Sequence, residues 1–306
     1  METKIHSASS VRACKNCKKD FVIEQEDFNF YEKIKVPPPT WCPECRMIRR
    51  MVFRDYRVLY KRKSDKTGEM IFSIFNPKSK FKIWEHSIWW SDEWDALDYG
   101  KEIDFNRTFL SQIKDLFFEV PLPSNAGWNM VNSDYSAGSN TLKNCYLVFV
   151  AAYSEDCMYS AEINNTKNSI DVTRIESSEL CYDSFALSKC YRTFFSSDCE
   201  NCMDVFFSRD LSGCNFCFGC TNLRNKQYYI FNELYSKEDY LRKINEFNLG
   251  SYDAISKIIE KTDKLLKDGV RKFISGHRNQ NISGEYINNS KNVHSSYYVS
   301  QAEDSK

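Results

Sequence analysis

The sequence predicts a mainly β fold: a small head with four cysteines, followed by a β-solenoid that a helical insertion interrupts. Three observations lead to this prediction. Two CxxC pairs lie near the start of the chain, a twelve-residue spacing of cysteines runs through its second half, and all seven prolines precede residue 124. The later residues therefore keep every backbone N–H available for a hydrogen-bonded ladder.

The composition indicates a folded protein with several domains and a sizeable core. The 306 residues are 42% hydrophobic and include only 10 glycines and 7 prolines. The chain has 13 cysteines and no basic-then-apolar leader at its start, a combination typical of an intracellular protein that keeps its thiols or binds metal. We therefore expect a cytoplasmic protein, with a virion as the alternative location. The longest apolar run, Cys145–Tyr153, is too short to span a bilayer, so we expect no membrane partner.

Five segments follow from the distribution of prolines, cysteines and tryptophans. In order, they are a basic metal-binding head with a hairpin, an aromatic and helical connector, a solenoid of 12-residue repeats, a helical insertion and a resumed solenoid repeat. Their bounds are 1–80, 81–123, 124–235, 236–275 and 276–306. Within the head, the turn Ser64–Gly68 between two strand-like runs predicts the hairpin.

The four cysteines of the head have the spacing of a zinc site. Cys14 and Cys17 form one CxxC pair, and Cys42 and Cys45 form the second pair further along the chain. Four thiolates at this spacing suit tetrahedral zinc, in a zinc knuckle of the treble-clef or ribbon type. Since four cysteine ligands close the coordination shell, we expect a structural zinc that the small head needs in order to fold, with no catalytic role.

Basic residues follow the second pair. They recur at steps of 4, 4 and 3 and then form a cluster, and they are Arg46, Arg50, Arg54, Arg57, Lys61, Arg62 and Lys63. On a helix from Arg46 to Tyr56 the arginines share one face, and guanidinium groups match phosphate oxygens. The sequence thus predicts contact with nucleic acid or a ribonucleoprotein. Because residues 1–63 carry 15 Lys/Arg against 8 Asp/Glu in a chain with no net charge, pairing with the acidic remainder or with a protein partner is the alternative.

The connector holds four of the six tryptophans, in the stretch WEHSIWWSDEW. Asp104 behind it is placed to cap a helix. Apolar residues recur there at helical spacing, at Phe105, Phe109, Ile113 and Phe117. We expect this helix to pack on an aromatic core.

The solenoid prediction rests on an internal repeat. The markers Cys145, Cys157, Ser169 and Cys181 are spaced by 12; after a step of 9, the spacing of 12 returns at Cys190, Cys202 and Cys214. Each marker lies in a short strand, commonly with Asn, Asp or Gly just before it. Stacked coils would bring these side chains into an inward ladder. The spacing fits a small coil that contains one repeat or a larger coil that contains two, and the alternative is an antiparallel sandwich.

Two helices interrupt the repeat. Ser236 with Asp239 resembles a capping box, and a second helix is expected over Ser251–Lys267. The spacing of Lys143 through Cys157 then returns from Lys291 through Ser305. Because an open last coil would expose strand edges, we expect a second copy or a protein partner to complete it, unless the chain is a truncated product.

A later group of cysteines has two interpretations. It comprises Cys199, Cys202, Cys214, Cys217 and Cys220. It could hold a second zinc or an iron–sulfur centre, or form a buried ladder. Side chains of a strand alternate between its two faces, and Cys217 lies three residues after Cys214. We therefore expect Cys217 to face outward unless a bulge intervenes.

We assign no catalytic residue. The chain contains no HExxH, GxSxG, P-loop or GxGxxG motif. Asp171, Asp183 and Asp204, with Arg192 between them, could form one acid–base column, but a solvated ladder of paired charges explains them equally well.

The order and spacing of several motifs carry a resemblance. They are CKNC, VPPPTWCPECRMIRR, WWSDEWDALDYG and CFGCTNLRNKQYYIFNELYSKEDY. With them the chain resembles a family of uncharacterised zinc-ribbon proteins with cysteine-rich repeats from environmental bacterial and giant-virus genomes. The resemblance covers most of the chain, implies zinc at the first four cysteines and implies no activity.

The sequence as a whole predicts a non-enzymatic, zinc-binding interaction protein that contacts nucleic acid or a ribonucleoprotein through its basic head. The alternatives are a structural component of a large assembly, such as a capsid or shell, and a carbohydrate-active β-helix enzyme.

Overall fold

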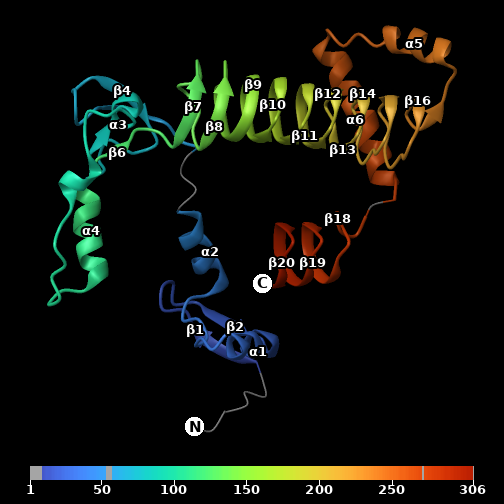
Figure 1. The fold of residues 1–306 in the computed structure, drawn as a ribbon. Helices are drawn as coiled ribbons and strands as arrows, with labels where there is room; N and C mark the ends of the chain where they lie inside the picture. The colour runs from blue at the N-terminus through green and yellow to red at the C-terminus, as the bar shows by residue number, and fades with distance from the viewer. Residues whose placement is uncertain (1–8, 53–56, 271, 306) are drawn as a thin grey trace. The chain divides into compact units, whose positions relative to one another are not determined.

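A computed structural model describes residues 9–52, 57–270 and 272–305. The chain forms two compact units. The first contains the residues up to Trp128 together with Asp134–Ser139, and the second contains Asn129–Ser133 and the residues from Asn140 onward. Strands predominate over helices, so the protein is mainly β, as predicted (Figure 1). No helix among the described residues has both the length and the apolarity that crossing a bilayer requires.

The first unit begins with a hairpin and two helices. Strands β1 (Ser10–Ala13) and β2 (Asp20–Ile23) pair antiparallel, and α1 (Gln25–Lys33) and α2 (Pro43–Met51) follow. The sequence favours a helix at α2 because Cys42 caps it, a proline occupies its first turn and arginines occupy its last. The helix predicted over Arg46–Tyr56 ends at Met51 with Val52 as its C-cap, and residues 53–56 lie outside the described part.

A second hairpin lies where the Ser64–Gly68 turn predicts it. Strands β3 (Tyr60–Lys63) and β4 (Met70–Ser73) pair antiparallel around that turn. The short β5 (Ile83–Trp84) then leads into α3 (His86–Trp89), the 3₁₀ helix η1 (Ala96–Tyr99), α4 (Phe109–Glu119) and β6 (Leu122–Pro123). Strands β5 and β6 pair in parallel, which ties the two ends of the connector together.

The connector helix packs on aromatic residues only at its C-terminal end, where Phe117 and Phe118 contact the ring of Phe81. Helix α4 begins after Thr108 rather than Asp104, and it contains no buried residue. Much of its apolar face stays exposed: Phe109 is 60% exposed, and Phe117 is 53% exposed despite its contact with Phe81. Asp104 does not cap α4; its carboxylate accepts the N–H of Asn106 at 2.9 Å in a local turn.

The second unit is dominated by an 11-stranded sheet (Figure 1). Its strands are β7 (Gly127–Val131), β8 (Ser139–Lys143), β9 (Tyr146–Asn164), β10 (Lys167–Glu176), β11 (Glu179–Ser188), β12 (Tyr191–Phe194), β13 (Ser197–Glu200), β14 (Met203–Phe206), β15 (Asn215–Phe218), β16 (Gln227–Ile230) and β17 (Glu233–Leu234). From β8 to β16 the registered pairings are parallel, and β17 pairs antiparallel with β16. An antiparallel sandwich, the alternative drawn from the sequence, is therefore wrong for this sheet.

The spacing between the cysteine markers is also the offset between paired strands. Cys157 pairs with Ser169, Tyr182 with Ile170, and Cys217 with Val205. Equivalent side chains of successive strands therefore lie one above another, about 4.8 Å apart.

Along these strands the burial of the side chains repeats every third residue. From Leu142 to Cys220 every third side chain is buried, and the residue just before each buried one has a positive φ, for example Asn144 (+53°) before Cys145 and Asp156 (+52°) before Cys157. This explains the Asn, Asp and Gly residues that precede the markers, since they tolerate left-handed backbone best. Side chains at these positions also bond to one another: Asn144 Nδ2 donates to Asp156 Oδ1 at 3.0 Å.

The predicted orientation of Cys217 is wrong. Because the side-chain period here is three rather than two, Cys214 and Cys217 both point inward, and each is fully buried. The period of three also explains the step of 9 between Cys181 and Cys190. Side chains 12 residues apart form one inward column, and a step of nine residues, which is three periods, keeps the marker inward but moves it to the neighbouring column.

The helical insertion covers one side of this sheet. Helices α5 (Lys237–Glu246) and α6 (Tyr252–Asp268) are capped by Ser236 and Ser251, as predicted. The insertion packs on an aromatic cluster, and Phe247 stacks on the fully buried Phe218 with ring centroids 4.4 Å apart. Beyond it lies a separate parallel sheet formed by β18 (Gly276–His277), β19 (Gln280–Asn288), β20 (Lys291–Ser300) and β21 (Glu303–Ser305).

Candidate metal centre

Two elements of the head deliver the four cysteines. Cys14 and Cys17 lie in the turn between β1 and β2, where the N–H of Cys14 bonds the carbonyl of Lys19 at 2.9 Å and that of Lys18 bonds the carbonyl of Cys14 at 3.0 Å. Lys18 closes this turn with a φ of +66°. Cys42 is the N-cap of α2, and Cys45 lies in its first turn. A turn and a helix start thus fix the backbone of all four residues.

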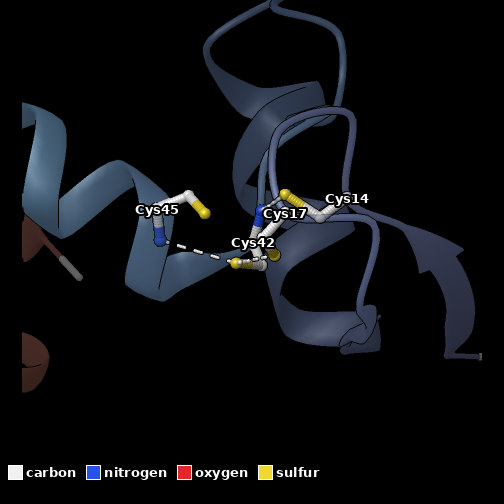
Figure 2. A group of neighbouring side chains, drawn as sticks. All are labelled: Cys14, Cys17, Cys42 and Cys45. Atoms are coloured by element: carbon white, nitrogen blue, oxygen red, sulfur yellow. Dashed lines mark hydrogen bonds between the residues drawn. The ribbon is translucent and has the colours of Figure 1, made fainter.

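Their sulfur atoms converge. The four Sγ atoms lie within 4.8 Å of one another, and three of the cysteines are buried while Cys17 is half-buried. Figure 2 shows the four side chains gathered in one place. Backbone N–H groups point at the cluster: that of Cys42 donates to Cys14 Sγ at 3.2 Å, and that of Cys45 donates to Cys42 Sγ at 3.5 Å. The side-chain amide of Asn16 donates to Cys45 Sγ at 3.4 Å.

The thiols are electrostatically unequal. Burial raises the pKa of Cys14, but the N–H groups of Cys42, Cys17 and Asn16 outweigh burial and lower that pKa to about 6. For Cys45 the Asn16 amide lowers the pKa, whereas burial and the three neighbouring thiols together raise it to about 11. Four thiolates cannot coexist here without a positive charge between them. A cation would supply that charge, so the four cysteines can bind one metal ion.

The predicted basic residues have different environments. Arg50 is exposed in the last turn of α2, while Arg46 is half-buried and its Nε has no hydrogen-bond partner among the described residues. Arg57, Lys61 and Lys63 are exposed, and Arg54 lies outside the described residues.

Arg62 differs from its neighbours because it is a structural residue. It is 7% exposed, donates to Asp65 Oδ2 at 2.9 Å and reaches the carbonyl of Asn76 and the hydroxyl of Ser79. Its guanidinium is therefore committed to holding the β3–β4 turn. The sequence prediction overlooked Arg49, which is exposed and lies 5.4 Å above the ring of Trp41; its position next to Arg50 was the signal that could have identified it.

The five later cysteines are all buried in the inward columns of the sheet. Each thiol donates to the carbonyl oxygen two residues before it, at 3.2 to 3.5 Å. The neighbouring Cys220 thiol and burial raise the pKa of Cys217, which keeps it a donor. Among the described residues, only the four head cysteines form a group of three or more potential ligands within 4.8 Å. Their burial and these bonds give the later thiols a structural role, and a second metal there stays a prediction.

The acidic column drawn from the sequence does not exist as one column. Asp171 and Asp183 are one offset of 12 apart, but Arg192 lies nine residues after Asp183 and so belongs to a neighbouring column. There Arg192 forms an ion pair with Asp204, its partner at an offset of 12. The acids and the base are therefore not aligned for a joint reaction.

Neither protein-family models nor curated proteins match this chain.

Proposed function

We propose that the chain is a non-enzymatic zinc protein whose head binds the phosphates of nucleic acid. The observation that carries the proposal is the position of Arg49 and Arg50. They are exposed in the last turn of the helix whose first turn supplies Cys42 and Cys45. The metal would fix that helix, and the helix would present two guanidinium groups with Lys61 and Lys63 nearby in the sequence.

Zinc is the metal that suits these ligands best. Four thiolates favour zinc in a tetrahedral site, whereas hard ions such as Mg²⁺ and Ca²⁺ prefer oxygen. The second cysteine pair comes from the start of a helix, which favours a treble clef over a ribbon. Metal binding would then hold the hairpin, α1 and α2 together.

The acidic second unit offers little reason for an internal clamp. Several of its carboxylates already pair with basic residues of the same unit, as in Arg174 with Glu162, Arg209 with Asp198 and Lys272 with Asp210. Among the described residues no ion pair joins Arg49 or Arg50 to a carboxylate. The pairing of these carboxylates within their own unit is what supports phosphate as the partner of the basic head.

We further propose that β7 to β16 form a β-solenoid with one 12-residue coil per offset. Two observations support this: successive strands pair in parallel at an offset of 12, and four inward side chains recur in each such interval. Inward serines take part in the ladder, since Ser169 Oγ accepts the N–H of Cys181 at 3.1 Å and donates to the carbonyl of Lys167 at 2.8 Å. The solenoid would act as a rigid scaffold for the head.

The test is binding of single-stranded RNA and double-stranded DNA to the full, metal-loaded chain over a range of salt concentrations. The variant Arg49→Glu/Arg50→Glu should bind more weakly and lower the slope of log K against log salt by about 2. The matched control is Lys257→Glu/Lys264→Glu, which makes the same charge change at exposed positions of α6 and should behave like the natural chain. No binding of either nucleic acid at low salt would refute the proposal.

A further inference from the structure

The two hairpins of the first unit have the same backbone plan. In β1 and β2, Ser10 pairs with Ile23 and Ala13 with Asp20; in β3 and β4, Tyr60 pairs with Ser73 and Lys63 with Met70. Adding 50 to both residue numbers of any pair in the first hairpin gives a pair of the second. The strands have the same length, and turns of equal length separate them.

The turns of the two hairpins also coincide under this renumbering. The N–H of Cys14 bonds the carbonyl of Lys19 at 2.9 Å, and the N–H of Ser64 bonds the carbonyl of Glu69 at 2.8 Å. Lys18 and Gly68 each bond back to the first turn residue, at 3.0 and 3.1 Å. Both have left-handed backbone, with φ of +66° and +80°. The Ser64–Gly68 turn is therefore a zinc knuckle in its backbone, with Ser64 and Thr67 in place of the two cysteines.

The second half of the cysteine site is repeated as well, although the connection from its hairpin is shorter and its described residues, 74–82, contain no counterpart of helix α1. The N–H of Lys15 bonds the carbonyl of Thr40, and the N–H of Asp65 bonds the carbonyl of Ile83, both at 2.9 Å. Two residues after each of these carbonyls a helix is capped, in the first case by Cys42 and in the second by Glu85. Each cap follows a tryptophan, and its carbonyl accepts the N–H four residues on at 3.0 Å.

The ligand positions hold a hydrogen-bonded cluster instead of thiols. The N–H groups of Lys66 and Thr67 donate to Ser64 Oγ at 3.1 and 3.3 Å, and the equivalent N–H groups of Asn16 and Cys17 bond the Cys14 thiol. The Ser64 hydroxyl donates to Glu85 Oε2 at 2.5 Å, and the Thr67 hydroxyl donates to Glu85 Oε1. One carboxylate thus joins both hydroxyls. Ile88, three residues after Glu85, occupies the place of Cys45.

We propose that residues 60–89 are a second, metal-free copy of the cysteine module formed by residues 10–51, in which Glu85 replaces the metal as the cross-link. The carboxylate links the knuckle turn to the start of α3 as a metal ion would link Cys14 and Cys17 to the start of α2. Two hydroxyls, one carboxylate and an aliphatic side chain are a poor donor set for zinc. The copy has also lost the basic face, since Asp92 and Glu93 follow Glu85 at the distances in sequence at which Arg49 and Arg50 follow Cys42.

The experiment restores the missing ligands in the full chain. The variant Ser64→Cys/Thr67→Cys/Glu85→Cys/Ile88→Cys should bind one equivalent of Co²⁺ more than the natural chain, measured by the thiolate charge-transfer and d–d absorption of tetrahedral cobalt. The control variant Ser64→Cys/Thr67→Cys has only two of the four ligands and should add no tetrahedral site. The outcome depends on the difference in bound Co²⁺ between the four-cysteine variant and the natural chain, so it does not depend on how much metal the head itself binds. A folded four-cysteine variant, with the far-UV circular dichroism of the natural chain, that gains no equivalent would overturn the proposal.

A second measurement tests the proposal even if the four-cysteine variant does not fold. Amide hydrogen exchange of the natural chain is compared before and after treatment with a chelator. Protection in β1 and β2 should fall, while β3 and β4 keep theirs, because Glu85 needs no metal. Loss of protection in both hairpins on chelation would contradict a metal-free copy, and in the variant Glu85→Ala the second hairpin should lose protection without any chelator.

Discussion

Gly219 is the position at which one added methyl group tests the packing of the helical insertion on the sheet. Its φ is +63°, and a Cβ at this position would lie 2.4 Å from Cε1 of the Phe231 ring. That ring has little freedom to retreat. Its centroid lies 5.9 Å from that of Phe218, and the ammonium of Lys261 on α6 lies 3.6 Å from its centroid.

The expected cost of Gly219→Ala has two parts. Left-handed backbone costs a non-glycine residue about 1 to 2 kcal/mol. Overpacking against an aromatic ring that cannot move costs about 1 to 3 kcal/mol more. We therefore expect a loss of about 2 to 5 kcal/mol in the free energy of unfolding.

Gly213 provides the matched control. Its φ is also +63°, but an added Cβ would meet Oδ1 of Asn225, at 2.3 Å. This atom is the end of an exposed side chain that can rotate away. Gly213→Ala should therefore cost only the backbone part, about 1 to 2 kcal/mol. The difference between the two variants isolates the contribution of the Phe231 ring.

The assay is urea unfolding of the full chain, followed by circular dichroism. The reasoning also requires that Gly219→Ala in a Phe231→Ala background costs no more than Gly213→Ala does alone. Equal losses from Gly213→Ala and Gly219→Ala in the natural background would show that the ring contributes nothing. A cost of Gly219→Ala that is undiminished in the Phe231→Ala background would show the same.

Three further predictions concern the first unit. Cys42→Ala removes both a ligand and the cap of α2, so the head should lose its metal and unfold. The expected result is a metal content near zero and a red shift of the Trp41 emission in a variant whose other tryptophans are replaced by Phe; retention of one equivalent would contradict the site. Arg62→Ala should lower the free energy of unfolding by about 1 to 3 kcal/mol, because the β3–β4 region loses a buried guanidinium and its hydrogen bonds to Asp65, Asn76 and Ser79. It should leave the salt dependence of nucleic-acid binding unchanged, whereas Lys63→Ala should lower that dependence and leave the stability unchanged. Burial raises the pKa of Glu85, but the Ser64 and Thr67 hydroxyls outweigh it and hold that pKa below its ordinary value. Folding thus favours the charged form of Glu85, so its contribution to stability is fully present above the unfolded pKa of 4.5 and is lost as the pH falls through the folded pKa. Glu85→Gln should destabilise the β3–β4 hairpin at pH 7 and make no difference in strong acid. An equal difference at both pH values would count against the carboxylate link.

Local signals predicted much of the fold. The cysteine pairs, the Ser64–Gly68 turn and the caps Ser236 and Ser251 each act within a few residues, so the sequence carries them directly. The spacing of 12 was equally readable, because stacking puts equivalent side chains in one column. These features needed no knowledge of distant contacts.

The errors came from an assumed period and from tertiary context. Alternation by two placed Cys217 outside, whereas left-handed residues at every third position turn the chain so that it faces in. Helical spacing identified α4 but could not say that none of its residues would be buried and that its aromatic contacts would be those of Phe117 and Phe118 with Phe81. The second copy of the cysteine module was hidden because substitution of Cys14 and Cys17 by Ser64 and Thr67 removes the residues that a motif search recognises.

The offset between paired strands restricts how this sheet can change its length. Removal or addition of one whole interval between two markers, such as Cys157 and Ser169, shortens or lengthens the stack by about 4.8 Å and returns each inward side chain to its own column. A change of one residue instead turns every later buried side chain toward solvent and moves asparagines away from left-handed positions. Tolerated insertions and deletions in this part of the gene should therefore come in multiples of twelve codons. Natural variants of this sheet should then differ in length by whole intervals of twelve residues.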